Sequence, residues 1–166
     1  MTILFSAYKQ EHLKQMTDMW NAVLLDGNAF PGEEYYSKAS FDNYLREQSL
    51  VTCVWLNGEL AGFFVIHPNN IGRCAHVANA SYVIDKKFRG KGIFNHMVGQ
   101  SLIQSKELGF LGMQFNAVVS TNYAAIKTYI NHGFEIVGTI RNGFRMKDNS
   151  FSNMYVMYRD LENKCS

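Results

Sequence analysis

The sequence predicts one α/β domain of the α+β type, with about four helices flanking a central mixed, mostly antiparallel sheet of seven strands. The chain has 166 residues, of which 47% are hydrophobic and 14% aromatic, so it can bury a full core. Asn57 and Gly58 separate two apolar runs, a pattern that favours an antiparallel hairpin. Helical and strand patterns alternate after a three-stranded meander, and this order disfavours a plain βαβ nucleotide-binding fold.

Nothing in the sequence divides the chain into parts. It has no internal repeat, low-complexity tract or Pro/Gly/Ser-rich linker, so we expect one domain over residues 1–166. The formal net charge of +2 is small and scattered, which argues against a nucleic-acid partner. No stretch approaches the length of a membrane span, and the N-terminus lacks a signal-peptide pattern. We therefore expect no membrane partner and a cytoplasmic location.

The cysteines give no sign of a metal site. Cys53, Cys74 and Cys165 lack the spacing of metal ligands, and three cysteines cannot all pair with one another. They are interpreted as reduced thiols of a cytosolic protein, and no metal is expected.

The first third of the chain predicts a strand over residues 2–8 and a helix over residues 11–25, whose apolar residues recur at helical spacing. A loop with two glycines and Pro31 covers residues 26–36. Ser40 is a candidate cap for a short helix that follows. This helix, loop and helix could shape an acceptor pocket.

The central part predicts the three strands of the meander. Residues 50–56 and 59–67 form the hairpin around Asn57-Gly58, which favours a type I′ turn. A second turn over residues 68–72 leads into a long strand over residues 73–84. This strand delivers the chain to a glycine-containing turn.

The glycine-containing turn predicts an anion site. Gly90 and Gly92 can take positive φ, so successive N–H groups can point into one concavity at the start of a helix that ends near Gly109. Four cations surround the same turn and suit a ligand with several phosphates: Lys86, Lys87, Arg89 and Lys91. Taken alone, a solvated strand-to-helix connection is an equally good interpretation.

The last third predicts a buried strand over residues 113–119 and then a short helix capped by Thr121 or Asn122 and ended by Gly133. Two further strands follow at about residues 134–140 and 151–158. The simplest interpretation of the loop between them, with Arg141, Arg145 and Lys147, is a solvated hairpin tip.

Two motifs resemble one known family. Residues 89–94 match the pattern Arg/Gln-x-x-Gly-x-Gly/Ala with Phe94 in the last place, and residues 122–134 match Asn-x-x-Ala-x-x-x-Tyr-x-x-x-Gly-Phe at every fixed position. Both are similar to motifs of the GNAT superfamily of N-acetyltransferases. In that family the final small residue of the first motif lets the loop close on a pyrophosphate. The ring of Phe94 must therefore point away from the ligand or narrow the site.

The resemblance implies a GNAT fold with a splayed wedge between the fourth and fifth strands, into which the pantetheine arm of acetyl-CoA inserts. It implies these cofactor-binding residues: Tyr82, Val83, Ile84, Arg89, Gly90, Lys91, Gly92, Ile93, Phe94, Asn122, Ala125 and Tyr129. Asn79 and Asn116 could face the acetyl end of the wedge, and Glu33 is a further substrate candidate. For each asparagine, a satisfied polar residue inside a sheet is an equal alternative.

The implied chemistry is attack of an amine on a thioester. A backbone N–H near Val83 can serve the oxyanion, and the hydroxyl of Tyr129 can protonate the departing sulfur. Many family members carry a Glu on the strand before the glycine turn, but residues 77–84 contain no carboxylate. The base is left open among Glu33, Glu34, His76 and Asp26. A water held by Asn79, or an acceptor that arrives partly neutral, would need no side-chain base.

We therefore expect an enzyme, an N-acetyltransferase that transfers acetyl from acetyl-CoA to a primary amine of a small molecule such as an amino acid, polyamine or amine antibiotic. Three alternatives remain. These are an acyl-CoA-binding module of the same fold without turnover, a protein N-terminal or lysine acetyltransferase, and a nucleotide-binding regulatory domain. The expected partners are acetyl-CoA and the amine, and a homodimer is left open.

Overall fold

The computed structural model describes residues 1–162 and contains a seven-stranded sheet in the order β1-β2-β3-β4-β5-β7-β6. The strands are β1 (Ile3–Ala7), β2 (Leu50–Leu56), β3 (Glu59–Pro68), β4 (Val77–Ile84), β5 (Gly112–Val119), β6 (Glu135–Arg145) and β7 (Phe151–Asp160). The α-helices are α1 (Leu13–Asp26), α2 (Lys38–Arg46), α3 (Ile93–Glu107) and α4 (Tyr123–Asn131). Three short 3₁₀ turns are η1 (Gln10–His12), η2 (Gly72–Cys74) and η3 (Lys86–Phe88). The predicted fold class is confirmed.

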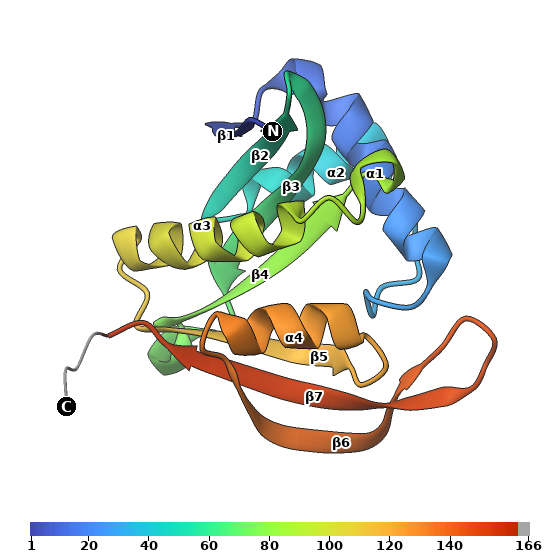
Figure 1. Cartoon of the computed structure of the whole chain (residues 1–166), viewed down its shortest axis with the longest axis vertical. Helices are drawn as coiled ribbons and strands as arrows, with labels where there is room; N and C mark the ends of the chain where they lie inside the picture. Colours follow the sequence, from blue (N-terminus) through green and yellow to red (C-terminus); the bar gives the residue numbers. More distant parts are fainter. Residues whose placement is uncertain (163–166) are drawn as a thin grey trace.

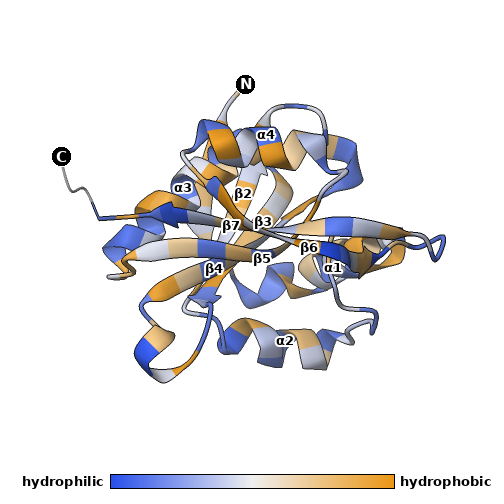
Figure 2. Ribbon diagram, turned by 90° about the horizontal axis from the view of Figure 1, so that it is seen from below, coloured by the Kyte–Doolittle hydropathy of each residue, from blue (hydrophilic) through white to orange (hydrophobic). Residues whose placement is uncertain are grey.

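The sheet separates two apolar cores, each covered by one pair of helices (Figure 2). Successive side chains of a strand point to opposite faces. Phe64 and Ile66 of β3 accordingly pack on the side of α3 and α4, and Phe63 and Val65 pack on the side of α1 and α2. On the second side, Trp20 is the centre of an aromatic cluster that includes Phe30, Phe41 and Phe63, with ring centroids 4.7, 5.6 and 6.2 Å from its own. Each pair of helices therefore covers one face of the sheet.

Local turn chemistry explains the hairpin and corrects one cap. Asn57 and Gly58 both have positive φ, of 50° and 85°, as the predicted type I′ turn requires. Helix α2 is capped by Ser37, whose side chain accepts a hydrogen bond from the Ser40 N–H (3.1 Å), so Ser40 is not the cap. Ser40 instead occupies the third helical position, and its hydroxyl accepts a hydrogen bond from the Ser37 N–H (3.0 Å), which completes a capping box.

Two strand boundaries differ from the prediction. β4 begins at Val77 and not at residue 73, because the N–H groups of Cys74 and Ala75 bond back to Ile71 and Gly72 in a 3₁₀ turn and so make no ladder contact. β6 continues through Arg145, so Arg141 and Arg145 belong to a strand and not to a hairpin tip. Charged side chains are tolerated there because β6 is the edge strand of the sheet.

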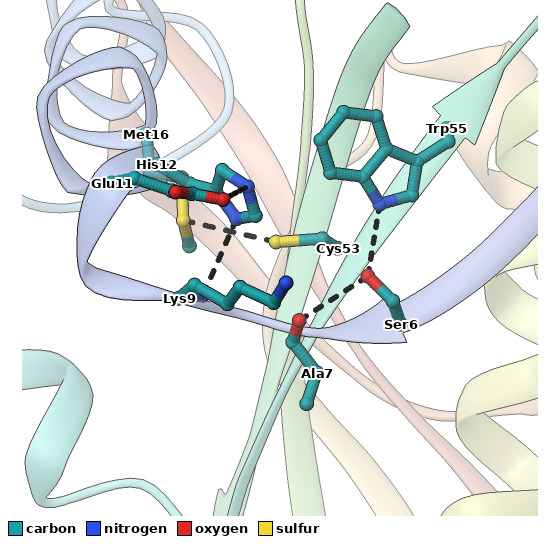
Figure 3. A network of polar contacts seen from close by, with 8 residues as sticks. All are labelled: Ser6, Ala7, Lys9, Glu11, His12, Met16, Cys53 and Trp55. Carbon is teal, nitrogen blue, oxygen red and sulfur yellow. Dashed lines mark hydrogen bonds and ion pairs between the residues drawn. The ribbon is translucent and has the colours of Figure 1, made fainter. Parts of the chain in front are cut away.

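The N-terminal end of the sheet is held by a local polar network (Figure 3). The indole N–H of Trp55 donates to the Ser6 hydroxyl (2.9 Å), and the Lys9 N–H donates to Nδ1 of His12 (3.3 Å). Cys53 lies among these residues with its sulfur 3.9 Å from that of Met16, and burial raises the pKa of its thiol to about 12. The network joins β1, β2 and the start of α1, and its Cys53 stays protonated at neutral pH.

Cys53 and Cys74 are free thiols, and Cys165 lies outside the described residues. In residues 1–162, no three His, Cys, Asp or Glu side chains lie close enough together to hold a metal ion. Within the same range, no helix has the length and hydropathy that crossing a membrane requires.

Candidate active site

The candidate site is a wedge between β4 and β5, the one parallel pair among the strand pairings of the described sheet. Their ladder is limited to Val77 with Gly112 and Ala78 with Met113. The strands meet at this end and diverge toward the other (Figure 1). On the far side of β5, a register shift in its pairing with β7 lies between Phe115 and Val118, so a bulge borders the same gap.

The hydrogen-bond phase of β3 and β4 determines which backbone groups of β4 face this wedge. At one end of the pair, the Asn69 N–H donates to the Val77 carbonyl (2.8 Å), and at the other the Asp85 N–H donates to the Ala61 carbonyl (2.9 Å). The direction of the backbone groups alternates along an antiparallel strand. The odd-numbered residues of β4 therefore direct their N–H and C=O groups toward β3, and the even-numbered ones direct theirs toward β5.

This phase separates the three β4 residues that the resemblance implied. The backbone groups of Tyr82 and Ile84 are directed into the wedge, where β5 makes no ladder with them. The Ile84 carbonyl already accepts a hydrogen bond from Nε of Arg89 (3.3 Å). Val83 is different, because its N–H is directed at β3 and its side chain is buried in the α1 and α2 core. A backbone N–H of Tyr82 or Ile84 is thus available to the wedge, but that of Val83 is not.

The glycine turn has the predicted backbone conformation. Gly90 and Gly92 have φ values of 76° and 75°, and a Cβ at either position would meet no atom within 4 Å. Conformation, and not crowding, is therefore the reason for glycine at both positions. Gly92 is the N-cap residue of α3 and supplies no side-chain cap, so the first N–H groups of this helix remain available to an anion.

The four cations of the turn are not equivalent. Lys86 and Arg89 form ion pairs with the two carboxylate oxygens of Asp26 at the end of α1, at 3.0 and 3.2 Å. The hydrogen bond from Lys86 is the main reason that the pKa of Asp26 is lowered. Lys87 instead pairs with Glu59 in the β2–β3 hairpin, and Lys91 lies over the ring of Phe88, 5.2 Å from its centroid.

Two cavities meet at the wedge. The larger has a volume of ≈ 970 Å³, and its lining includes Lys86, Arg89 and Asp26 as well as Ile84 and the start of α4 at Asn122. The smaller has a volume of ≈ 270 Å³ and lies among β3, β4, β5 and the loop that follows α1. Five residues line both cavities and therefore mark their junction: Ala29, Phe30, Tyr82, Phe94 and Ala125.

Helix α4 brings the second motif to the junction. Asn122 caps the helix through a hydrogen bond that its Oδ1 accepts from the Ala125 N–H (3.3 Å). Two turns later, Tyr129 lies against Phe115 with ring centroids 4.4 Å apart and lines the smaller cavity. Its hydroxyl has no hydrogen-bond partner among the described residues, and burial raises its pKa well above the ordinary value. Tyr129 thus presents a protonated, uncommitted hydroxyl group at neutral pH.

Phe94 narrows the junction. Its ring packs edge-on against Tyr82 and Tyr129, with centroids 5.4 and 5.6 Å away, and it lines both cavities. The sequence left two orientations open for this ring, away from the ligand or into the site. In the structure the ring points toward the two cavities. Tyr82 is held beside it, because its hydroxyl forms a 2.7 Å hydrogen bond with the hydroxyl of Ser101 on α3.

Three asparagines form a bridge where β4 and β5 separate. Asn79 and Asn116 each donate a side-chain N–H to the same acceptor, Oδ1 of Asn69, at 2.9 and 2.7 Å. Asn79 is the next residue of β4 after the last ladder pair with β5. We name these three residues the asparagine bridge. It holds the amide groups of Asn79 and Asn116, both of which line the smaller cavity.

The other predicted site residues lie elsewhere. Glu33 pairs with Arg145 (2.6 Å) and lines a separate cavity between the loop after α1 and the β6–β7 hairpin. Glu34 is exposed and lines neither of the two wedge cavities, and His76 is exposed just before β4 at the closed end of the wedge. Ile93 is buried in the core under α3, where it packs without reaching either cavity.

The sequence interpretation missed three residues of the smaller cavity and its rim: Phe30, His67 and Asn69. Phe30 lies in a loop without periodicity. His67 is the penultimate residue of β3 and follows the apolar run over residues 60–66, and Asn69 follows Pro68 in a turn. A histidine at the end of an apolar strand is a weak signal, and only the pairing of β3 with β4 places it beside Asn79.

Comparison with known proteins agrees with this geometry. Residues 13–134 match the acetyltransferase (GNAT) family. The N-acetyltransferase aca1 of Schizosaccharomyces pombe is 26% identical over 156 residues, which cover 84% of this chain and 75% of that protein. The L-amino acid N-acetyltransferase AaaT of Escherichia coli is 24% identical over 112 residues, which cover 68% of this chain and 67% of that one.

Solved structures share the fold. A GNAT superfamily phosphinothricin acetyltransferase from Sinorhizobium meliloti, in complex with AcCoA, has a TM-score of 0.89 at 18% identity, covering 96% of this chain and 89% of its own. A GCN5-related N-acetyltransferase from Kribbella flavida has a TM-score of 0.87 at 23% identity, covering 95% and 97%. The family match spans most of the chain and includes both the glycine turn and the α4 motif. The chain therefore belongs to the acetyltransferase (GNAT) family, whose members are acyltransferases that use acetyl-CoA.

Proposed function

We propose that this protein transfers the acetyl group of acetyl-CoA to the primary amine of a small molecule. One observation carries the proposal: the wedge joins a cavity beside an anion-binding turn to a smaller, amide-lined cavity, and Tyr129 lies at their junction. Such an arrangement suits two substrates that approach from opposite faces of the sheet and meet between β4 and β5.

The residues of the larger cavity fit the donor. The N-terminus of α3, which no side chain caps, has Lys86 and Arg89 beside it and suits a pyrophosphate. The backbone groups of Tyr82 and the N–H of Ile84, which make no ladder with β5, suit the amides of an extended pantetheine arm, which would lie along β4 as an additional strand does. Asn122 and Ala125 line the same cavity and would contact that arm.

The residues at the junction suit acyl transfer. An oxyanion that forms in the wedge would accept a hydrogen bond from a backbone N–H of Tyr82 or Ile84, in place of the donor expected near Val83. Tyr129 would donate a proton to the departing sulfur. Its raised pKa keeps the hydroxyl protonated until that moment.

The smaller cavity supports a small acceptor with a single amino group. Its volume is ≈ 270 Å³, and among the described residues no Asp, Glu, Lys or Arg lines it. A polyamine or a polycationic antibiotic would need carboxylates in this place. The lack of carboxylates therefore disfavours the polycationic acceptors and leaves a free amino acid as the acceptor that we propose. The name of the relative AaaT, an L-amino acid N-acetyltransferase, supports the same class.

One alternative keeps structural support. Phe94 narrows the junction, and residues 77–84 carry no carboxylate, so a protein that binds acyl-CoA without turnover is the second candidate. A homodimer also stays a prediction, to be measured by sedimentation. The free thiols of Cys53 and Cys74 support the predicted cytoplasmic location.

The proposal is tested by incubating the protein with acetyl-CoA and a panel of acceptors, while CoA thiol is followed with a chromogenic disulfide. The panel comprises the L-amino acids, a polyamine, an aminoglycoside and a peptide with free N-terminal and lysine amines. Thiol release with at least one amino acid, absent without acceptor, is expected. Binding of acetyl-CoA in calorimetry without turnover on any amine would instead favour the binding module.

A further inference from the structure

The proposed reaction lacks a proton acceptor, and the side chains considered for that role do not lie at the junction. Asp26 is paired with Lys86 and Arg89 at the glycine turn, and Glu33 is paired with Arg145 in another cavity. We propose that His67 is the general base of the acceptor site, which takes the proton that the amine loses when it attacks. This inference rests on the proposed acetyl transfer and assigns one residue of the same site.

His67 has the right position. It lies at the end of β3, directly opposite Asn79 of β4 in the strand register, and it lines the smaller cavity together with Asn116. It also lines a groove of ≈ 680 Å³ on the outer side, near the end of α2. One edge of the imidazole can thus serve the acceptor amine, while the groove offers a route by which the accepted proton reaches solvent.

The hydrogen bonding of His67 defines its tautomer. Nδ1 lies 2.9 Å from the carbonyl oxygen of Pro68. A carbonyl oxygen can only accept, so Nδ1 carries the hydrogen of this bond. In the neutral ring the other nitrogen, Nε2, then has a free lone pair. This is the state that a general base needs, and a backbone contact maintains it without any second titratable residue.

The other ionisable groups around His67 do not compete for this role. On the cavity side these are Tyr82 and Tyr129, and burial raises the pKa of both, so they are neutral. On the groove side they are Tyr44, whose pKa burial also raises, and Glu47. Glu47 belongs to the outer groove and not to the cavity. Among the described residues, His67 is thus the only imidazole or carboxylate that lines the acceptor cavity.

The proposed step is balanced in atoms and charge. The lone pair of the neutral amine forms a C–N bond to the acetyl carbonyl, and the C–S bond breaks. The proton lost by the amine nitrogen passes to Nε2 of His67, and the sulfur receives the proton of the Tyr129 hydroxyl. Imidazolium and tyrosinate then return to their starting states by exchange with solvent, which leaves the acetamide and CoA thiol.

The test compares His67→Gln with the matched control His76→Gln, which changes an exposed histidine outside both cavities. With an amino acid found active on the wild type, kcat/KM of His67→Gln should fall by roughly 10² to 10⁴. On the acidic side of the pH profile, general-base catalysis requires two deprotonated groups in the wild type, the amine and His67, but only the amine in His67→Gln. The slope of log kcat/KM against pH should therefore fall by one unit in His67→Gln and stay unchanged in His76→Gln.

Two further measurements separate a base from a structural residue. Affinity for acetyl-CoA by calorimetry and the melting temperature should match the wild type in His67→Gln. Nitrogen NMR of the neutral wild-type ring should show Nδ1 protonated and Nε2 unprotonated. The opposite tautomer would overturn the proposal, as would wild-type kcat/KM with an unchanged slope in His67→Gln. If the wild type transfers acetyl to no amine, the proposed function fails first and His67 has no reaction to serve.

Discussion

The candidate site is built in two ways on the two sides of the sheet. In the larger cavity, the groups that would hold the donor come from two contiguous segments, the glycine turn and the start of α4, and Asp26, Asn28 and Lys147 complete the polar lining. In the smaller cavity and its rim, the polar groups come from four separate segments: His67 from β3, Asn69 from the turn after it, Asn79 and Ser81 from β4, and Asn116 from β5. The first arrangement presents backbone N–H groups and cations, and the second presents neutral amides and one imidazole.

This difference follows from the ligand that each side would bind. A pyrophosphate is recognised by backbone donors that a short turn can supply alone, so a local motif is sufficient. An acceptor amine is recognised by side chains placed around it, and these can be drawn from any strand that borders the cavity. The donor side should therefore respond to changes in backbone conformation and charge, whereas the acceptor side should respond to the loss of single side-chain contacts.

The largest effect is expected at the glycine turn. Gly92→Glu places a side chain at φ 75° and a negative charge at the start of α3, where it opposes an anion. Acetyl-CoA binding in calorimetry should be lost. Gly109→Glu is the matched control, because Gly109 also has positive φ, 88°, and open space around its Cβ position, but it follows the other end of α3. Unchanged affinity in Gly92→Glu would contradict the donor assignment.

The next effect is expected at the junction. Tyr129→Phe removes only the hydroxyl, so kcat should fall by roughly 10² to 10⁴ while affinity for acetyl-CoA and melting temperature stay close to wild type. Tyr123→Phe makes the same change on the same helix at a residue that is 75% exposed. Steady-state kinetics with both variants decide the point. Wild-type kcat in Tyr129→Phe would leave Tyr129 as a core aromatic residue.

A smaller effect is expected on the acceptor side. Asn69→Ala removes the shared acceptor of the asparagine bridge and frees the amides of Asn79 and Asn116. Loss of about 1.4 kcal/mol in acceptor positioning would raise KM for the amine roughly tenfold. Affinity for acetyl-CoA should not change. Asn70→Ala alters the neighbouring residue, whose Oδ1 accepts from the Ile71 N–H and takes no part in the bridge, so it should leave both constants unchanged. A parallel loss of acetyl-CoA affinity in Asn69→Ala would show that the bridge serves both sides.

The smallest effect is expected at Asp26. Its pKa is lowered by Lys86 and then by Arg89, so it remains a carboxylate throughout the neutral range and competes with a phosphate for both cations. Asp26→Asn should tighten acetyl-CoA binding, by less than about fivefold, since exposed ion pairs are worth at most about 1 kcal/mol. Calorimetry at low and high salt measures this gain, which salt should diminish. Weaker binding in Asp26→Asn would mean that Asp26 orients the cations for the ligand.

The sequence by itself determined the class of fold, the β2–β3 hairpin and the glycine turn, and it narrowed the cap of α4 to Thr121 or Asn122. In each case the relevant contacts lie within a few residues, as with the positive φ of Asn57 and Gly58 or the bond from Ala125 to Asn122. It also placed Tyr129 in a motif, which the family match includes. Local backbone conformation can be predicted from a sequence because the interacting groups are neighbours along the chain.

Only the tertiary structure decided which residues border the smaller cavity and where each charged candidate lies. The register of β3 against β4 brings His67 beside Asn79, and the divergence of β4 from β5 lets Asn69 bridge to Asn116. The pairing of Glu33 with Arg145, 112 positions apart, likewise places this substrate candidate beside a separate cavity. Strand register and long-range ion pairs depend on how the whole core packs, and no short stretch of sequence contains that information.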